Sequence, residues 1–71
     1  MSYRVEVATT RRPEYSEEGP ICMHFETATM MLEDILADPE PGLLGVRIRD
    51  TARDPRQYNP IVVSVERPHG R

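Results

Sequence analysis

The sequence predicts a small α+β domain in which one helix packs across one face of a four-stranded sheet, in the chain order strand, strand, helix, strand, strand. Two observations predict this fold. Four segments alternate apolar and polar residues, as half-buried strands do. One segment between the second and third of them repeats apolar residues at helical spacing. With 71 residues, the chain 1–71 has the size of one domain.

The first half of the chain predicts two strands joined by a loop. Residues 3–9 alternate apolar residues with arginine, glutamate and alanine, and residues 21–25 alternate again. Residues 10–20 lie between them and carry two prolines and a glycine, which are typical of turns. We therefore expect a hairpin of two strands, with residues 10–20 as a mobile connection.

A helix is predicted over residues 28–37. Its apolar residues follow the i, i+3, i+4, i+7, i+8 pattern of a helix that buries one stripe. Thr27 is the expected N-cap residue, because its hydroxyl can accept a hydrogen bond from the first turn. Asp38 precedes Pro39, which disfavours helical backbone there and ends the helix.

The second half predicts a second pair of strands. Residues 44–49 and 61–66 alternate apolar residues with glycine, arginine, valine, serine and glutamate. Residues 50–60 are polar and form a long flexible loop between them. Residues 67–71 are expected to be a frayed tail.

The alternation divides the side chains between two faces of the sheet. The predicted core consists of Val5, Val7, Ile21, Met23, Phe25, Ala28, Met31, Leu32, Ile35, Leu36, Leu44, Val46, Ile48, Ile61, Val63 and Val65. The open face is predicted to show Arg4, Glu6, Cys22, His24, Arg47, Arg49, Val62, Ser64 and Glu66. A slip of one residue in a strand would exchange its two faces.

Composition excludes several classes of protein. No apolar run approaches the roughly 20 residues of a membrane helix, and no apolar segment of a secretory signal follows the N-terminus. We therefore expect a cytoplasmic protein that does not contact membranes. All nine basic residues are arginine, against twelve acidic residues, for a formal net charge of −3. This balance argues against a protein dedicated to nonspecific duplex binding, which needs a basic face.

Nothing in the sequence predicts an enzyme or a cofactor. Cys22 and His24 share a predicted strand face and could form half of a zinc site or a thiol with a histidine base. Zinc needs three or four ligands, and no second Cys/His pair exists. No glycine-rich phosphate loop or known hydrolase motif occurs either. We predict no catalytic residue, no metal site and no cofactor.

The outer face of the predicted helix is the first candidate binding surface. Glu33, Asp34 and Asp38 lie outside the apolar stripe, with Met30 among them. No lysine or arginine occurs between Gly19 and Arg47, so the helix lacks the Glu–Lys pairs that usually support one. An acidic rim around a methionine could bind a basic partner protein. The alternative is a solvated helix face with no partner.

The arginines provide a second candidate surface. Two strands and the second loop place several of them near one tyrosine, which could contact phosphates and stack on a base. The alternative is pairing with nearby carboxylates across the strands. The residues concerned are Arg4, Arg47, Arg49, Arg53, Arg56 and Tyr58.

These observations favour a small binding or accessory protein that docks on another protein. A modulator or inhibitor from a phage or another mobile element of a GC-rich bacterium fits its size and its use of arginine alone. Self-association as a homodimer through an edge strand is a variant of this hypothesis. Nucleic-acid binding through the open sheet face is the alternative. It ranks lower because the predicted open face carries no Phe or Tyr.

Overall fold

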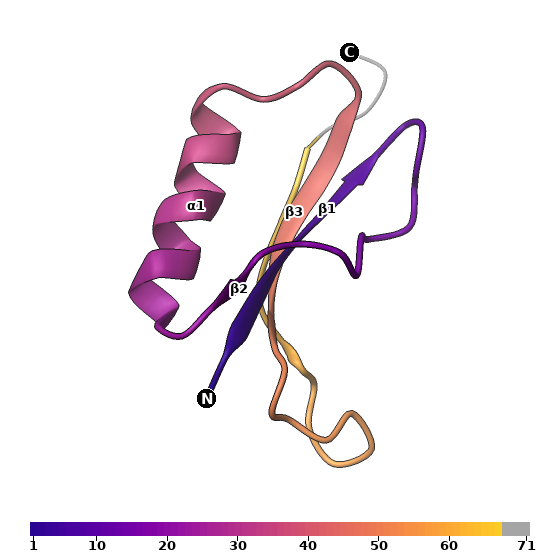
Figure 1. The fold of residues 1–71 in the computed structure, drawn as a ribbon. Coiled ribbons are helices and arrows are strands. Elements are labelled where there is room, and N and C mark those ends of the chain that lie inside the picture. Colours follow the sequence, from indigo (N-terminus) through magenta and orange to yellow (C-terminus); the bar gives the residue numbers. More distant parts are fainter. Residues whose placement is uncertain (68–71) are drawn as a thin grey trace.

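The computed structural model describes residues 1–67 and confirms the predicted fold class and element order (Figure 1). One helix packs on an antiparallel sheet with the strand order β2-β1-β3-β4. The tail predicted at 67–71 lies outside the described residues except for Arg67, whose N–H donates to the Leu44 carbonyl at 2.8 Å. The elements are β1 (Tyr3–Thr9), β2 (Ile21–Cys22), α1 (Phe25–Ala37), β3 (Leu43–Asp50) and β4 (Ile61–Glu66).

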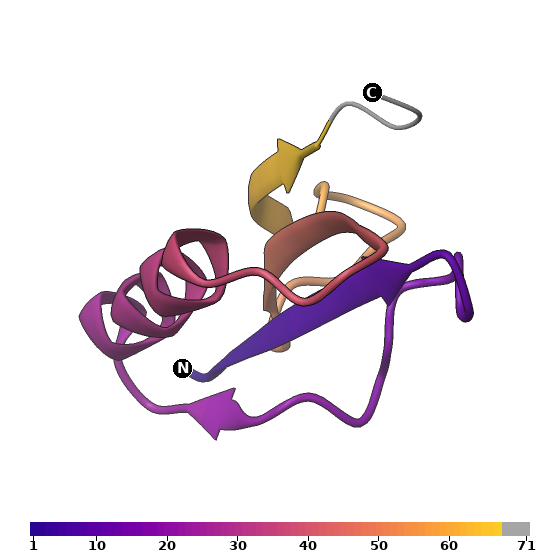
Figure 2. The same cartoon turned by 90° about the horizontal axis from the view of Figure 1, so that it is seen from above.

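The helix covers only part of the sheet. It lies against β1, β2 and β3, and none of its Cα atoms comes within 8 Å of a Cα atom of β4. In Figure 2, α1 lies on one side of the sheet and the yellow β4 projects away beyond β3. Strand β4 is therefore an edge strand whose helix-side face is left partly uncovered.

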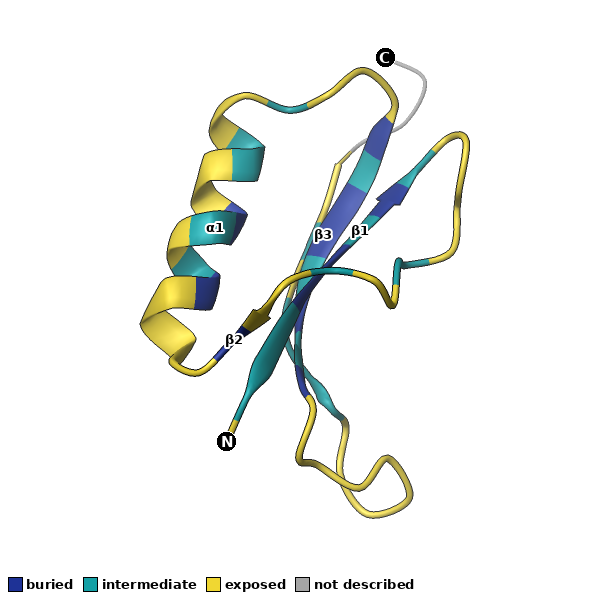
Figure 3. Cartoon of the chain, viewed as in Figure 1, coloured by how far each residue is buried: buried dark blue, intermediate teal, exposed yellow. Residues whose placement is uncertain are grey.

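The core lies where α1 meets β1 and β3 (Figure 3). Five of the predicted core residues are buried there, and six more are half-buried around them. The buried five are Val5, Ala28, Leu32, Val46 and Ile48. The half-buried six are Val7, Met31, Ile35, Leu36, Val63 and Val65.

The prediction of a strand over 21–25 and a helix from 28 was wrong at its boundaries. Strand β2 ends at Cys22, and the helix begins at Phe25 after His24, which adopts an extended backbone as N-cap. The predicted N-cap Thr27 lies inside the first turn. Phe25, predicted in the core, is 42% exposed at the start of the helix, where its ring packs edge-on against Tyr3 at 5.5 Å.

The two faces of β2 are the reverse of those predicted. Cys22 pairs with Tyr3 on β1 and therefore shares its helix side. The Cys22 thiol is buried, 3.4 Å from the Met31 sulfur. Ile21 and Met23, which were predicted in the core, are 55% and 68% exposed. A two-residue strand has too little alternation to fix which face is buried.

Two register shifts move further residues between the faces. The shift between Ala8 and Thr9 places Leu43 in the core, where Leu44 was predicted. The shift between Ile48 and Arg49 pairs Ile61 with Arg49, on the open face, and lets Val62 pack against the core. A bulge inserts one residue into a strand, so strict alternation assigns the residues beyond it to the wrong face.

The 10–20 connection lies against the sheet. The Ser16 N–H donates to the Val7 carbonyl at 3.1 Å, and the Val5 N–H donates to the Pro20 carbonyl at 3.3 Å. Gly19 passes so close to the Val5 carbonyl that a Cβ there would overlap it. The connection therefore runs along β1 and covers part of the face that was expected to be open.

Candidate functional surfaces

The outer face of α1 is acidic and exposed. Glu33, Asp34 and Asp38 are all exposed, and Met30 among them is 65% exposed. We call these four residues the acidic helix face. Within residues 1–67, none of its three carboxylates forms an ion pair. All four residues that the sequence predicted for this surface are exposed, on α1 or at its C-terminal end.

The charges of the acidic helix face are arranged against helix stability. Asp34 and Asp38 are four residues apart, a spacing at which like charges repel on a helix. Asp38 is the C-cap residue, and the last turn contains no basic residue. A carboxylate at this end faces the negative pole of the helix dipole, which costs a few tenths of a kcal/mol or more. Neither the helix nor the described part of the fold compensates these charges.

The arginines of the sheet converge on one buried carboxylate. Glu6 was predicted on the open face, yet only 1% of its side chain is exposed. Its Oε1 accepts a hydrogen bond from Arg47 Nε at 2.6 Å, and its Oε2 accepts one from Arg49 Nε at 3.1 Å. Arg4 Nε lies 3.2 Å from the same Oε2, although its N–H is not aligned for a hydrogen bond. We call these four residues the Glu6 cluster.

Strand register explains the Glu6 cluster. Glu6 pairs directly with Arg47 across β1 and β3, and Arg4 pairs with Arg49 one step further along the same face. Each arginine turns its Nε toward the carboxylate. The pairing of arginines with carboxylates, considered as an alternative in the sequence, is therefore confirmed for this part of the sheet.

Tyr15 covers the Glu6 cluster and is a residue that the sequence analysis missed. The Arg47 guanidinium carbon lies 4.0 Å from the centre of the Tyr15 ring, a cation–π contact. The Tyr15 hydroxyl occupies the space that a side chain at Gly45 would fill. Arg4 Nη1 also donates to the Glu17 carbonyl at 2.8 Å. Two features of the sequence could have indicated this contact: Tyr15 is the one aromatic residue of the polar 10–20 connection, and Gly45 lies inside a strand, where glycine often marks the close approach of another group.

The remaining predicted arginine-surface residues lie apart from the Glu6 cluster. Arg53 pairs with Asp50 at 3.4 Å and donates to the Asn59 carbonyl at 3.1 Å. Arg56 and Tyr58 are exposed in the loop between β3 and β4. The structure thus divides the predicted surface into a sheet part, which is internally paired, and a loop part.

Cys22 and His24 do not form a common site. The Cys22 side chain faces the core, whereas His24 is exposed at the start of the helix. Across residues 1–67, no three His, Cys, Asp or Glu side chains come together in a way that could hold a metal ion.

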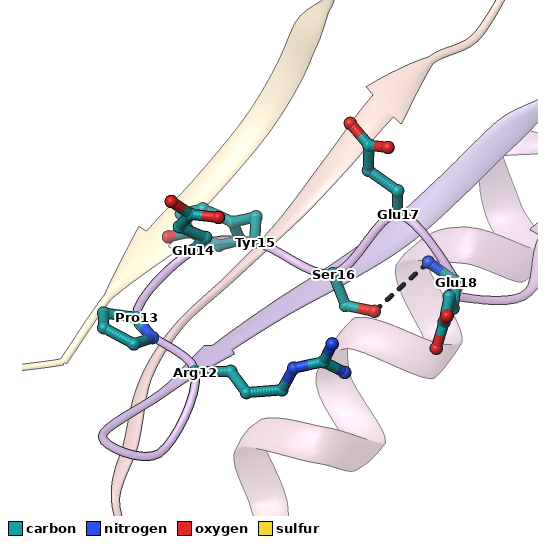
Figure 4. Close-up of a pocket in the computed structure, with 7 residues that line it drawn as sticks. All are labelled: Arg12, Pro13, Glu14, Tyr15, Ser16, Glu17 and Glu18. Carbon is teal, nitrogen blue, oxygen red and sulfur yellow. Dashed lines mark hydrogen bonds between the residues drawn. The ribbon is translucent and has the colours of Figure 1, made fainter.

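A shallow hollow of about 560 Å³ lies on the 10–20 connection (Figure 4). It is lined by residues 12–18 alone, and the Ser16 hydroxyl accepts a hydrogen bond from the Glu18 N–H at 3.2 Å. No core element contributes a side chain to it. The hollow is thus formed by the shape of the loop itself.

The chain matches no protein-family model, no curated protein and no solved structure. None of the helices in the described part of the chain has the length and apolar character needed to cross a bilayer.

Proposed function

We propose that this chain is a non-enzymatic docking module that binds a basic surface of another protein through the acidic helix face. One observation carries the proposal: three exposed carboxylates without ion-pair partners, within residues 1–67, lie on the same helix face as an exposed methionine. Complementary charge on a partner speeds association and selects the partner. Met30 supplies an adaptable apolar side chain for the centre of the contact.

The two sides of the molecule differ in how their charge is balanced, and this supports the choice of surface. On the sheet side, the Glu6 cluster pairs its own charges. On the helix side, like charges stand together at a cost to helix stability. A partner that carries arginine or lysine would offset this cost on binding.

Reversing the charge of the helix face should abolish partner binding while the fold stays intact. The change is the double substitution Glu33→Arg and Asp34→Arg, at two exposed positions. We expect the immobilised variant to capture at least tenfold less of the partner protein from host lysate than the wild-type chain does. The variant should also fail to bind that partner once it has been purified. The matched control is Glu17→Arg with Glu18→Arg, which changes the net charge equally on the exposed 10–20 connection. Equal binding by both double variants would remove the acidic helix face as the docking surface.

Nucleic-acid binding remains the second candidate because the Glu6 cluster has three guanidinium groups for one carboxylate. Our proposal predicts that the purified protein is free of nucleic acid and does not bind a labelled single-stranded oligonucleotide at 150 mM salt. The measurements are the 260/280 nm absorbance ratio and fluorescence anisotropy. If the wild-type protein bound the oligonucleotide and the Arg47→Gln and Arg49→Gln variants bound it with a weaker salt dependence, nucleic-acid binding would become the favoured function. Each lost phosphate contact lowers the slope of affinity against salt.

A further inference from the structure

Strand β4 is the unprotected edge of the sheet. The other edge, β2, has two residues and follows Pro20, so it offers little backbone for pairing. Strand β4 has six residues, Ile61–Glu66, with no proline, a bulge at Val62 and one charged residue at its end. Natural edge strands usually carry charges, prolines or bulges along their length that prevent pairing with another chain. Strand β4 lacks such protection over Val63, Ser64 and Val65.

The hydrogen bonds to β3 show which backbone groups of β4 are free. Glu66 pairs with Gly45, and the Arg67 N–H donates to the Leu44 carbonyl. In an antiparallel ladder this makes Glu66 and Gly45 a non-hydrogen-bonded pair, so the Glu66 backbone groups point away from β3. The same alternation directs the N–H and C=O of Ser64 outward, while those of Val65 point to β3. Within residues 1–67, Ser64 and Glu66 therefore present a free edge.

The apolar side of this edge is also uncovered. Val65 pairs with Val46, which is fully buried, so both side chains lie on the helix side of the sheet. No Cα atom of the helix lies within 8 Å of β4, and Val65 remains half-buried. A strand added to this edge would cover Val65 and would satisfy the free backbone groups of Ser64 and Glu66.

We propose that a second copy of this chain fills the edge, with its β4 antiparallel to the first and the two-fold axis at Val65. Ser64 then lies opposite Glu66 of the second copy, and the reverse pair is identical by symmetry. These two pairs form four backbone hydrogen bonds. The two Val65 side chains meet on the helix side, in the gap between the two helices. The result is one continuous sheet through both copies.

Charge complementarity favours a second copy over an unrelated strand. On the open face, Ser64 pairs with Arg47 of β3. In this register Glu66 of the second copy lies opposite Ser64, on the same face of the sheet. Its Cα atom is then two strand spacings, about 10 Å, from the Cα atom of Arg47. At this distance Glu66 of the second copy attracts Arg47 through space, while the Arg47 Nε keeps its hydrogen bond to Glu6. Glu66 forms no ion pair within residues 1–67, and only the Nε of Arg47 donates to Glu6.

The register can be tested by disulfide trapping. In a Cys22→Ala background, we expect Val65→Cys to form a covalent dimer under mild oxidation, because facing residues of a non-hydrogen-bonded pair have Cα atoms about 4.5 Å apart. The matched control is Val63→Cys, two residues along the same strand. Its copies would stand about 14 Å apart and should cross-link at least tenfold more slowly. Equal rates for the two variants would overturn the proposed register.

The wild-type chain and one charge variant test the dimer without a cysteine. An edge contact made by so few residues of each copy buries less surface than the roughly 1,200 Å² found in stable complexes. By light scattering, the mass should therefore rise from 8.2 kDa toward twice that value as the concentration approaches about 1 mM. Glu66→Arg should weaken the dimer at least tenfold, whereas Glu40→Arg, an equal charge change at an exposed position away from β4, should not. A monomer throughout this range would contradict the proposal.

Discussion

Replacing Glu6 by glutamine should lower the free energy of unfolding by about 3 kcal/mol, because removal of one partner leaves buried charges uncompensated. Glutamine keeps the shape of the side chain and removes its charge. Three guanidinium groups would then face one another without a carboxylate. About a quarter of each arginine side chain is exposed, so water offsets part of the loss and keeps it near the lower end for such clusters.

Urea unfolding monitored by circular dichroism measures this loss. The matched control is Glu66→Gln, an exposed glutamate on β4 without an ion pair within residues 1–67, which should change stability by less than about 0.5 kcal/mol in the monomer. A single replacement of Arg4 or Arg49 should cost less than the Glu6 change, since two arginines remain on the carboxylate. A loss below 1 kcal/mol for Glu6→Gln would show that the Glu6 cluster does not hold β1 and β3 together.

Truncating Leu32 to alanine should destabilise the protein by about 2–5 kcal/mol, as buried leucine-to-alanine changes do. Leu32 is 6% exposed and lies in the centre of the contact between α1 and the sheet. Ile35 is only half-buried at the margin of the core, so the same truncation there should cost about half as much. For a domain of this size, each kcal/mol lowers Tm by about 4–8 °C.

Thermal unfolding of Leu32→Ala and Ile35→Ala compares how much each helix position contributes to stability. Met30→Ala is the control, because Met30 is 65% exposed on the same helix and its loss should leave Tm within about 3 °C of the wild type. A change below half a kcal/mol at both Leu32 and Ile35 would contradict the packing of this helix face on the sheet.

The parts of the fold that repeat along the sequence were predictable from it. The helical stripe through Leu32 and the alternation around Val5, Val46 and Ile48 each extend over several turns or residue pairs, and all four residues are buried. Periodicity of this length fixes which face meets the core. The acidic helix face follows from the same stripe, because residues outside it face away from the sheet.

The features that were missed depend on single residues or on long-range pairing. Two bulges exchange the faces of Leu44 and Ile61, and a bulge leaves no signature in apolar alternation. Glu6 alternates like a surface residue, and its burial results from Tyr15 and the 10–20 connection folding across the sheet. A loop of this kind is placed by individual contacts, so its position could not be predicted from a repeating pattern.

The central claim is that partners dock on the acidic helix face, and methionine-methyl NMR of the complex with the captured partner tests it most directly. The four methionines report on different parts of the molecule: Met30 on the acidic helix face, Met31 beside the core, Met23 directly after β2, and Met1 beside the loop between β3 and β4. We predict that the Met30 methyl signal shifts on binding, whereas those of Met1 and Met23 do not. An unchanged Met30 signal, with shifts at Met1 or Met23, would contradict the claim and place the partner beside the β3–β4 loop or beside β2, respectively.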